Sequence, residues 1–419
     1  MTKKRYAIVG AGDRGLGMFA LPLVKDLSQT AELVAFVDDN PLRMQYACSL
    51  LPKPVACYTN FGRMLAEADV DGVIIATKDC THADYVIRAM KAGKRAFSEK
   101  PLCVSAKQCR AILSAAKASG QTCLTTHNAR YGPATSETWK IIRSGRLGKI
   151  KFMQFEETLD RRHGADYFRR WHRNKANSGG LQIHKASHHF DLLNWFAASS
   201  PEQVVAQGRL AFYGKNNSFR GKRCSKCRHT AKCEFFADVS KKDRYVGLYT
   251  QAESADGYVR DGCVFDKSID IEDQFSAQIR YENGIEVCYS LVAYSPIETM
   301  RIVIEGTKGR LELAATHNTA WALGSTTLPG VEKLFSQTLR LYMPNKGIID
   351  VPLTQREGSH GGSDPQLRAD FFGRDWKLKP NEQMADVHQA VQAVLIGAAI
   401  NKSLATGKPV NVQSLLHRD

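Results

Sequence analysis

The chain has 419 residues and carries 58 Lys plus Arg against 42 Asp plus Glu, a formal net charge of +16. This length is enough for two domains with separate hydrophobic cores. The basic residues are spread along the chain and form no recognised nucleic-acid module, so an anionic cofactor or substrate explains the charge better than nucleic acid does.

The expected cellular setting follows from the start of the chain and from its cysteines. Residues 1–5 run straight into the first predicted strand without an apolar leader, and no apolar stretch is long enough to cross a membrane. The 11 cysteines are odd in number and scattered, which is typical of a reducing compartment rather than a disulfide framework. We therefore expect a cytoplasmic protein with no membrane partner.

A phosphate-binding motif follows the first apolar strand, Tyr6–Val9. The sequence Gly-Ala-Gly-Asp-Arg-Gly over residues 10–15 leads into a helical pattern over Leu16–Leu27. Glycine lets the chain turn sharply, and it lets a pyrophosphate approach N–H groups at the positive end of the helix dipole. The motif predicts a dinucleotide site that includes Gly10, Gly12, Asp13, Arg14 and Gly15.

Asp38 ends the second predicted strand, about twenty residues after the glycines. An acid at this place accepts hydrogen bonds from a ribose diol and repels a 2′-phosphate, which favours NAD over NADP. Two alternatives stay open. Asp38 can be a helix N-cap before Asn40-Pro41, and Arg14 or Arg43 can admit a 2′-phosphate.

Apolar strands and amphipathic helices alternate up to about residue 126, which predicts a parallel, doubly wound sheet. Thr77–His82 follows the third of these strands, at the edge where such sheets bind ligands. Glu99-Lys100-Pro101 closes the next strand and places a lysine where the fold would hold the cofactor ring. Thr77, His82, Glu99 and Lys100 are therefore cofactor-binding candidates. The predicted strands are Tyr6–Val9, Leu33–Val37, Gly72–Ala76, Arg95–Ser98 and Thr122–Thr125, and helices are expected over Ala83–Ala92 and Ala106–Ser119.

The pattern changes after Arg130, where a helix over Ser136–Ser144 precedes a series of strand-like segments. Several of them alternate polar and apolar residues, and Tyr281-Glu282-Asn283-Gly284 is a hairpin turn. These features predict an antiparallel or mixed sheet with one face covered by helices. The expected strands are Ile150–Glu157, Val204–Phe212, Ile271–Tyr281, Ile285–Ala293, Met300–Glu305 and Arg310–Leu313.

These patterns divide the chain into a dinucleotide-binding domain over 1–127 and a second α/β domain over 128–381. A Cys-rich segment over about 213–263 is expected to be inserted in the second domain. A helix near Glu382–Lys402 opens the last part of the chain, 382–419, which we expect to pack back on the first domain.

Four cysteines in the inserted segment have the spacing of metal ligands: Cys224, Cys227, Cys233 and Cys263. Zinc prefers four thiolates in a closed tetrahedral site, and the basic neighbours would favour ionised thiols. A structural zinc would also explain how a polar insertion folds. An iron–sulfur cluster and a set of free surface thiols are the alternatives, and His229 can replace one thiol.

Over nearly its whole length the chain resembles the Gfo/Idh/MocA family of NAD(P)-dependent sugar oxidoreductases. The resemblance implies an N-terminal Rossmann domain, a C-terminal α/β domain with a large, mostly antiparallel open sheet, and a homo-oligomer (dimer or tetramer) formed through that sheet. It rests on Gly10–Gly15, Thr77–His82 with Lys78 in place of the family proline, Glu99–Pro101, Ser144–Ile150, and the stretch GGLQIHKASHHFD over residues 179–191.

The last motif carries the catalytic roles that the resemblance implies. His188 matches the family histidine, which we predict to be the base, and Lys100 matches the lysine that contacts substrate and nicotinamide. His184 stands where the family has an aspartate, so an imidazole replaces a carboxylate in the proton relay. Residues 184, 188 and 191 share one helical face by their spacing, and Lys185 lies beside that face.

Substrate contacts are expected from aromatic and basic residues around these motifs. Trp171 would stack on the apolar face of a sugar, and the neighbouring arginines would hold hydroxyls or a carboxylate. His360 lies in a glycine-rich loop that is either part of the site or an ordinary turn. The candidate substrate residues are Asn128, Arg130, Tyr167, Arg170, Trp171, His172, His189 and His360.

The resemblance thus implies an NAD-dependent enzyme that removes hydride from a secondary hydroxyl of a sugar, cyclitol or glycoside. A first alternative is a glycosidase that keeps NAD bound and oxidises its substrate only transiently, with elimination and re-reduction. A second is a non-catalytic NAD-binding sensor.

Overall fold

The computed structural model describes residues 3–324, 328–376 and 381–417. Met1 and Thr2, the first residues of the predicted leaderless start, lie outside these ranges. The chain divides into two compact units, each assembled from three stretches of sequence. Unit 1 holds residues 1–131, 239–260 and 358–391, and unit 2 holds residues 132–238, 261–357 and 392–419.

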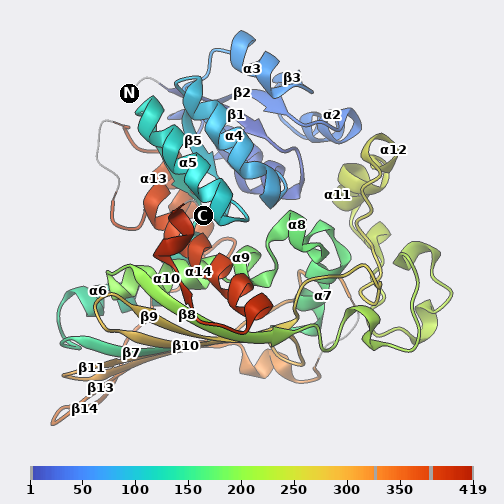
Figure 1. Cartoon of the computed structure of the whole chain (residues 1–419). Helices are drawn as coiled ribbons and strands as arrows, with labels where there is room; N and C mark the ends of the chain where they lie inside the picture. The colour runs from blue at the N-terminus through green and yellow to red at the C-terminus, as the bar shows by residue number, and fades with distance from the viewer. Residues whose placement is uncertain (1–2, 325–327, 377–380, 418–419) are drawn as a thin grey trace. The chain divides into compact units, whose positions relative to one another are not determined.

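Unit 1 is built on a seven-stranded sheet in the order β15-β6-β5-β4-β1-β2-β3 (Figure 1). Its first six strands are parallel, which confirms the doubly wound fold, and β15 pairs antiparallel with β6 at one edge. The order places β1 between β2 and β4, where such folds open a crevice at the carboxyl ends. The strands are β1 (Lys4–Val9), β2 (Ala31–Val37), β3 (Ala56–Tyr58), β4 (Gly72–Ile75), β5 (Arg95–Ser98), β6 (Cys123–Thr125) and β15 (Ala385–Asp386).

The helices of unit 1 begin where the sequence supplies caps. Asn40, Asn60 and Ser105 each accept a backbone N–H at a helix start, and Gly120 ends α5 in the left-handed conformation. The elements are a π-helical turn η1 (Gly15–Ala20) continuing as α1 (Leu21–Lys25), α2 (Pro41–Ser49), α3 (Phe61–Glu67), α4 (Asp79–Lys91), α5 (Ala106–Ser119), the 3-10 turn η2 (Asn128–Tyr131) and α13 (Ser363–Phe372).

A late part of the chain completes the core of unit 1. The Tyr6 ring on β1 meets Phe372 of α13 edge to face at 5.2 Å between centroids, and Phe97 on β5 meets the same ring. Such aromatic pairs bury a large apolar area. Residues 358–391 therefore belong with the dinucleotide-binding unit, although the sequence divided the chain near residues 127 and 381.

Unit 2 contains a nine-stranded sheet in the order β14-β13-β12-β11-β7-β10-β9-β8-β16. Among these described strands β7 and β10 are parallel neighbours and the remaining pairs are antiparallel, which confirms the predicted large, mostly antiparallel sheet. The strands are β7 (Ile150–Asp160), β8 (Pro201–Arg209), β9 (Gln274–Tyr281), β10 (Glu286–Ser295), β11 (Thr299–Gly306), β12 (Arg310–Thr316), β13 (Ser336–Met343), β14 (Gly347–Asp350) and β16 (Val410–Asn411).

One face of this sheet is buried and the other is open. In β9, Phe275, Ala277 and Ile279 are buried, whereas the intervening side chains are exposed or half-buried. Helices α6, α9 and α10 lie over a single face (Figure 1). The helical elements of this unit are α6 (Pro133–Arg143), α7 (Arg161–Arg169), η3 (Trp171–Arg173), α8 (Lys175–Ser178), α9 (Leu181–His184), α10 (Ser187–Ala197), the short turns η9 (Val331–Leu334) and η10 (Gln413–Leu416), and the later part of α14 (Val387–Thr406).

The predicted insertion is divided between the two units. Residues 213–238 belong to unit 2 and contain η4 (Gly214–Asn216), η5 (Cys224–Lys226) and η6 (Thr230–Lys232). Residues 239–260 belong to unit 1 and contain η7 (Val239–Lys241), α11 (Asp243–Tyr245), η8 (Val246–Thr250) and α12 (Glu253–Asp256).

The last predicted helix begins later than expected. Ala385 and Asp386 pair with β6 as a strand, so α14 starts at Val387 rather than near Glu382. Within the described ranges, no helix is both long and apolar enough to span a bilayer.

Candidate functional site

The glycine motif forms the turn that the sequence predicts. Gly10 has a φ of +100°, and a Cβ there would lie 2.5 Å from the Ala76 carbonyl oxygen. A Cβ on Gly15 would lie 1.9 Å from the Gly10 carbonyl oxygen. The β1–helix turn is therefore possible only with glycine at both positions, and it brings the Asp13 amide to the start of the helix. This cradle fits a dinucleotide.

Asp38 lies buried beside the same turn, at the end of β2. Its Oδ2 accepts the N–H of Ala11 at 2.7 Å, and its Oδ1 accepts the N–H of Asn40 at 2.9 Å. Burial raises the Asp38 pKa to about 6, against the opposing charge of Arg43 and these two amides. Asn40, not Asp38, caps α2, so the alternative reading of Asp38 as an N-cap is wrong.

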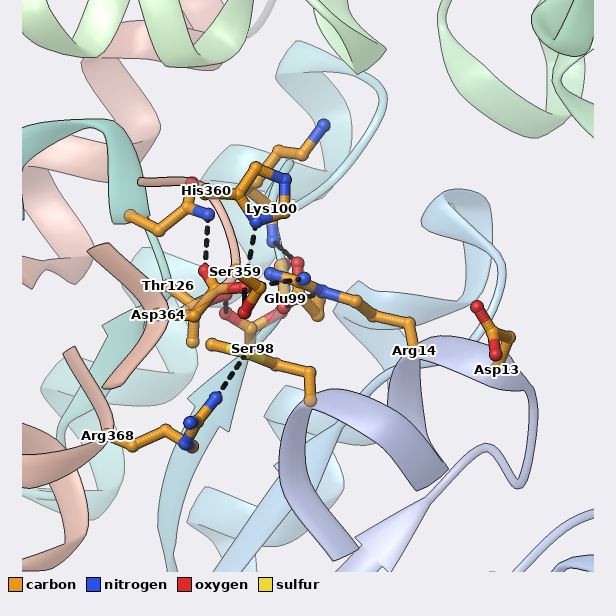
Figure 2. Close-up of polar contacts among 12 residues, drawn as sticks. Asp13, Arg14, Ser98, Glu99, Lys100, Thr126, Ser359, His360, Asp364 and Arg368 are labelled. Atoms are coloured by element: carbon orange, nitrogen blue, oxygen red, sulfur yellow. Dashed lines mark hydrogen bonds and ion pairs between the residues drawn. The ribbon is translucent and has the colours of Figure 1, made fainter. Parts of the chain in front are cut away.

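Lys100 follows β5 in a turn that is fixed from several sides. Its backbone N–H donates to Glu99 Oε2 at 3.2 Å, and Glu99 Oε1 accepts Arg14 Nε at 2.8 Å. The Lys100–Pro101 bond is cis. In Figure 2 the Lys100 side chain extends away from the Glu99 carboxylate. The turn thus joins the glycine motif to the second motif that the sequence identified.

His82 is buried beneath this turn and contacts its backbone. Its ring nitrogens face the carbonyl oxygens of Pro101 at 2.7 Å and Thr77 at 3.1 Å, and the residue is 1% exposed. Burial lowers the His82 pKa, and a ring with a single proton donates to only one of the two carbonyl oxygens. His82 therefore lies between Thr77 and Pro101 and bonds to one of them. The Thr77 hydroxyl pairs with that of Thr81 at 2.8 Å.

Asp364 is the centre of a polar cluster that the sequence did not single out (Figure 2). Its carboxylate accepts from Asn128 at 2.7 Å and from Ser359 at 2.8 Å, and it lies 2.8 Å from His360 Nδ1 and 3.5 Å from Arg14. Burial alone would raise the Asp364 pKa, but His360, Arg14 and Asn128 hold it well below its usual range. The predicted substrate residues Asn128 and His360 therefore meet on one carboxylate.

Arg130 lies apart from this cluster. It is 1% exposed, and its guanidinium donates to the Glu382 carbonyl oxygen at 3.4 Å and to Gln389 at 3.2 Å. These contacts tie η2 to the residues just before α14 and to the first turn of that helix.

In unit 2 the histidine-rich motif does not form one continuous helix. α9 ends at His184, Lys185 and Ala186 form a turn, and α10 begins at Ser187. The N–H of Ala186 bonds to the Leu181 carbonyl at 2.9 Å, five residues back, which widens the turn. The prediction that residues 184, 188 and 191 share one helical face assumed one continuous helix, and this wide turn falls between His184 and His188.

His184 belongs to an aromatic cluster. Its ring centroid lies 4.1 Å from that of His172, 5.3 Å from Tyr167 and 5.8 Å from Trp171. Trp171 in turn stacks on His172 at 3.6 Å. The structure thus brings together four of the residues that the sequence selected from two separate motifs.

Lys185 and His189 share a buried carboxylate, Glu157 of β7. Lys185 Nζ lies 2.9 Å from Glu157 Oε1, and His189 Nε2 lies 3.8 Å from Oε2. Burial would lower the Lys185 pKa, but Glu157 raises it above its ordinary value. His189 also pairs Nδ1 with the Tyr289 hydroxyl at 2.8 Å. His188, at the start of α10, is half-buried.

Tyr167, His163 and Glu298 form a hydrogen-bonded chain. His163 Nδ1 lies 3.0 Å from both Glu298 oxygens, and its Nε2 lies 2.8 Å from the Tyr167 hydroxyl. Because a carboxylate only accepts, Nδ1 donates to Glu298, and Nε2 can accept from the phenol whenever the ring carries a single proton. Burial would raise the Glu298 pKa, but His163 and Lys185 lower it to about 2. Burial raises the Tyr167 pKa to about 12, opposed by Lys185 and Arg170.

Arg170 closes this side of the cluster. Its guanidinium pairs with Asp166 at 3.0 Å and lies 5.9 Å from the centroid of the Tyr167 ring. This arrangement places a fixed positive charge beside the phenol.

The four cysteines line one small pocket, but the predicted zinc site is not supported. In the part of the chain that the structure describes, no group of three or more His, Cys, Asp or Glu side chains is arranged to hold a metal ion. Burial raises the Cys224 pKa, and Arg223 pairs with Asp261 at 2.8 Å instead of favouring a thiolate. The segment also has its own apolar core, because the Tyr213, Phe235 and Phe265 rings pack together.

Sequence reasoning missed His163, Glu157, Glu298 and Asp364. Each is one polar residue within a strand, helix or loop, and no local spacing marks it. The alternating pattern of β7 offered one signal, because Glu157 falls on the buried side of the strand, where a charged residue needs a partner.

Two family models together match most of the chain. Residues 4–127 match the oxidoreductase family's NAD-binding Rossmann fold, and residues 140–412 match the family's C-terminal alpha/beta domain. The Bacillus subtilis protein YteT is 30% identical over 430 aligned positions that cover 98% of each chain. Inositol 2-dehydrogenase of Rhizobium meliloti is 28% identical over 207 residues, 48% of this chain and 57% of the relative.

The solved structures agree on the fold. The WlbA dehydrogenase from Bordetella pertussis, determined with NADH and UDP-GlcNAcA, superposes with a TM-score of 0.63 at 18% identity and covers 98% of both chains. With the Rossmann sheet, the glycine turn and Lys100 in place, the chain belongs to the Gfo/Idh/MocA family and is an NAD-binding oxidoreductase.

Proposed function

We propose that the protein is an NAD-dependent dehydrogenase that oxidises a secondary hydroxyl of a sugar, cyclitol or glycoside. The observation that carries this proposal is the turn after β5, where Glu99 and Arg14 fix the backbone of Lys100 in an NAD-binding Rossmann unit. Inositol 2-dehydrogenase is among the relatives, and the WlbA structure contains a sugar nucleotide, which supports a carbohydrate or cyclitol substrate.

The chemistry requires two transfers and one stabilising charge to be arranged at one carbon. NAD, when bound, accepts the hydride that leaves the carbon. A base must take the hydroxyl proton, so that the C–O bond becomes a carbonyl. A positive charge beside the oxygen stabilises the charge that develops there, and Lys100 is the proposed source.

His188 remains the family-derived candidate for the base, and the hydrogen-bonded chain adds Tyr167. The substrate hydroxyl would give its proton to the Tyr167 oxygen while the phenol gives its own proton to His163 Nε2. Glu298 would then stabilise the imidazolium through the bond to Nδ1. The number of protons is conserved in this exchange. The Tyr167 proton moves along its existing hydrogen bond to His163, so neither side chain has to change position.

Substrate binding is proposed for the aromatic cluster. Trp171 offers an apolar ring face, and His172 and His184 offer ring nitrogens for hydroxyl groups. Lys185, paired with Glu157, is proposed to act through its charge on the Tyr167 phenol rather than as a base.

The experiment follows the absorbance of reduced nicotinamide when purified protein meets excess NAD and a panel of sugars, cyclitols and glycosides. Growth beyond one equivalent per protein identifies a dehydrogenase and its substrate class. A signal that stops at one equivalent or less while a glycoside disappears would favour the redox-assisted glycosidase. A panel with no turnover at all, despite NAD binding, would favour a sensor.

Two variants test the residue assignments. Lys100→Ala and His188→Asn should stay folded and bind NADH but lose turnover, whereas the exposed controls Lys91→Ala and His388→Asn should not. Parent-like turnover in both site variants would reject the proposed active site.

The open face of the unit 2 sheet is proposed as the contact between copies in a homo-oligomer. A groove on it is lined by Gln154, Glu156, Gln207, Gln278 and Ser290, which come from four adjacent strands. Val205 is an exposed apolar residue on the same face. Light scattering of the parent and of Gln278→Arg tests this; a monomeric parent would reject it. A cytoplasmic location remains part of the proposal.

A further inference from the structure

Residues 239–260 pack on the dinucleotide-binding turn within unit 1. Leu248 is fully buried in the core of the unit, and a Cβ on Gly247 would fall 2.2 Å from ring atoms of Tyr46 on α2. The family resemblance gave no role to this segment. Its close packing shows that it is an integral part of the unit rather than a loosely attached surface loop.

Two side chains of the segment reach the glycine motif. The Tyr249 hydroxyl accepts the N–H of Asp13 at 2.9 Å, and Arg244 pairs with the Asp13 carboxylate at 3.0 Å. Arg244 also lies against Gly17, where a Cβ would be 2.4 Å from its guanidinium. The segment therefore covers the N–H group to which a pyrophosphate would bind.

The far end of the segment reaches Arg43, beside the ribose-binding acid. Arg43 Nη1 lies 3.1 Å from Asp38 Oδ1, Nη2 lies 2.5 Å from Asp256 Oδ2, and Nε donates to the Leu248 carbonyl at 3.1 Å. Every nitrogen of this guanidinium has an acceptor, and two of the three acceptors lie within residues 239–260. Arg43 is 8% exposed.

Both arginines that could serve a 2′-phosphate are thus committed to carboxylates. Arg14 pairs with Glu99 and Asp364, and Arg43 is clamped between Asp38 and Asp256. Discrimination against NADP by a dinucleotide fold needs an acid at the ribose, whereas acceptance needs an available arginine. The Asp256 carboxylate keeps Arg43 from binding a 2′-phosphate, and it adds a negative charge beside Asp38.

We propose that Asp256 is a specificity-determining residue of the cofactor site: it holds Arg43 on Asp38 and so excludes a dinucleotide with a 2′-phosphate. This inference rests on the proposed NAD-dependent function and adds the residue, outside the Rossmann motifs, that decides between the two cofactors. Asn40 supports the same arrangement, because its amide donates to the Ala252 carbonyl at 2.9 Å.

The test measures binding of NADH and NADPH to the full-length protein by nicotinamide fluorescence. Asp256→Asn keeps the side-chain shape but removes the charge, so Arg43 becomes available to the 2′-phosphate. We expect the ratio of the NADPH to the NADH dissociation constant to fall about tenfold, the low end for one charge-assisted hydrogen bond. Asp256→Glu should keep the parent ratio, as should Asp243→Asn, which removes an exposed charge from the same segment.

A second substitution identifies the arginine. Adding Arg43→Ala to Asp256→Asn should abolish the gain in NADPH binding, and thermal melting confirms that each variant is folded. An unchanged ratio in Asp256→Asn would overturn the inference, as would an equal loss of both dinucleotides, which would show that Asp256 only supports the fold. Binding of neither dinucleotide to the parent protein would instead reject the proposed function, and the inference with it.

Discussion

The hydroxyl of Tyr167 lies 2.8 Å from Nε2 of His163, and the opposite nitrogen of the same ring lies 3.0 Å from Glu298. A buried phenol is thereby connected to a carboxylate through an imidazole that can take its proton. Tyr167 and His163 are one helical turn apart on α7, whereas Glu298 is the residue just before β11.

Removing the imidazole should stop proton transfer without affecting the cofactor. With a substrate from the panel, His163→Gln and Tyr167→Phe should each lower turnover about 10²- to 10⁴-fold, the range for loss of general acid–base catalysis. NADH binding should be unchanged. The control is Tyr281→Phe, which removes another buried phenol of unit 2 that bonds to Asn194.

The pH dependence of turnover distinguishes a catalytic role of His163 from a role in supporting the fold. If Tyr167 transfers the proton through His163, the limb of the rate profile that reports the imidazole should disappear in His163→Gln. A profile of parent shape, merely lower, would contradict the relay.

The contribution of Glu298 to the free energy of unfolding should be lost in acid. Its pKa in the folded protein is about 2, below the ordinary 4.5, so its stabilisation is fully present above about pH 4.5 and is lost as the pH falls toward 2. The shift corresponds to at most about 3 kcal/mol of unfolding free energy. Urea unfolding of parent and Glu298→Gln should therefore show a difference that shrinks with acid. A difference that stays constant from pH 6 to 3 would contradict this assignment.

Two glycines of the same motif should behave differently when replaced by alanine. A Cβ on Gly15 would meet the Gly10 carbonyl at 1.9 Å, whereas a Cβ on Gly12 would lie 3.4 Å from the Tyr249 hydroxyl. Gly15→Ala should therefore lower the melting temperature by distorting the turn. Gly12→Ala should fold normally but bind NADH more weakly, because its methyl group enters the space of the pyrophosphate. Equal melting temperatures for the two variants would contradict the geometry.

Tyr249 should compete with the cofactor for the Asp13 amide. Tyr249→Phe keeps the ring that packs over Arg43 at 5.8 Å but removes the acceptor from that N–H. NADH binding should strengthen by about 0.5–1.5 kcal/mol, the worth of one hydrogen bond no longer exchanged. Weaker binding, measured by the same fluorescence titration, would instead show that the hydroxyl contacts the cofactor.

The sequence alone determined the elements whose signals are local. The glycine turn, Asp38 and the β5 turn at Lys100 are each defined by a strand, its length and the residues that follow it. Helix α5 was predicted at its observed bounds, Ala106–Ser119, and the structure shows Ser105 capping one end and Gly120 the other. The large second sheet followed from alternating burial, which depends on each strand by itself.

Only the tertiary structure decided which distant residues share a site. Glu157 comes from β7, His163 from α7 and Glu298 from the residue before β11, and no spacing in the chain relates them. The break between α9 and α10 depends on one backbone bond, from Ala186 to Leu181, that competes with the regular helical pattern. Asp256 could not be assigned to the cofactor site because more than two hundred residues separate it from Arg43. Such contacts depend on the packing of whole elements, which local propensity and periodicity do not encode.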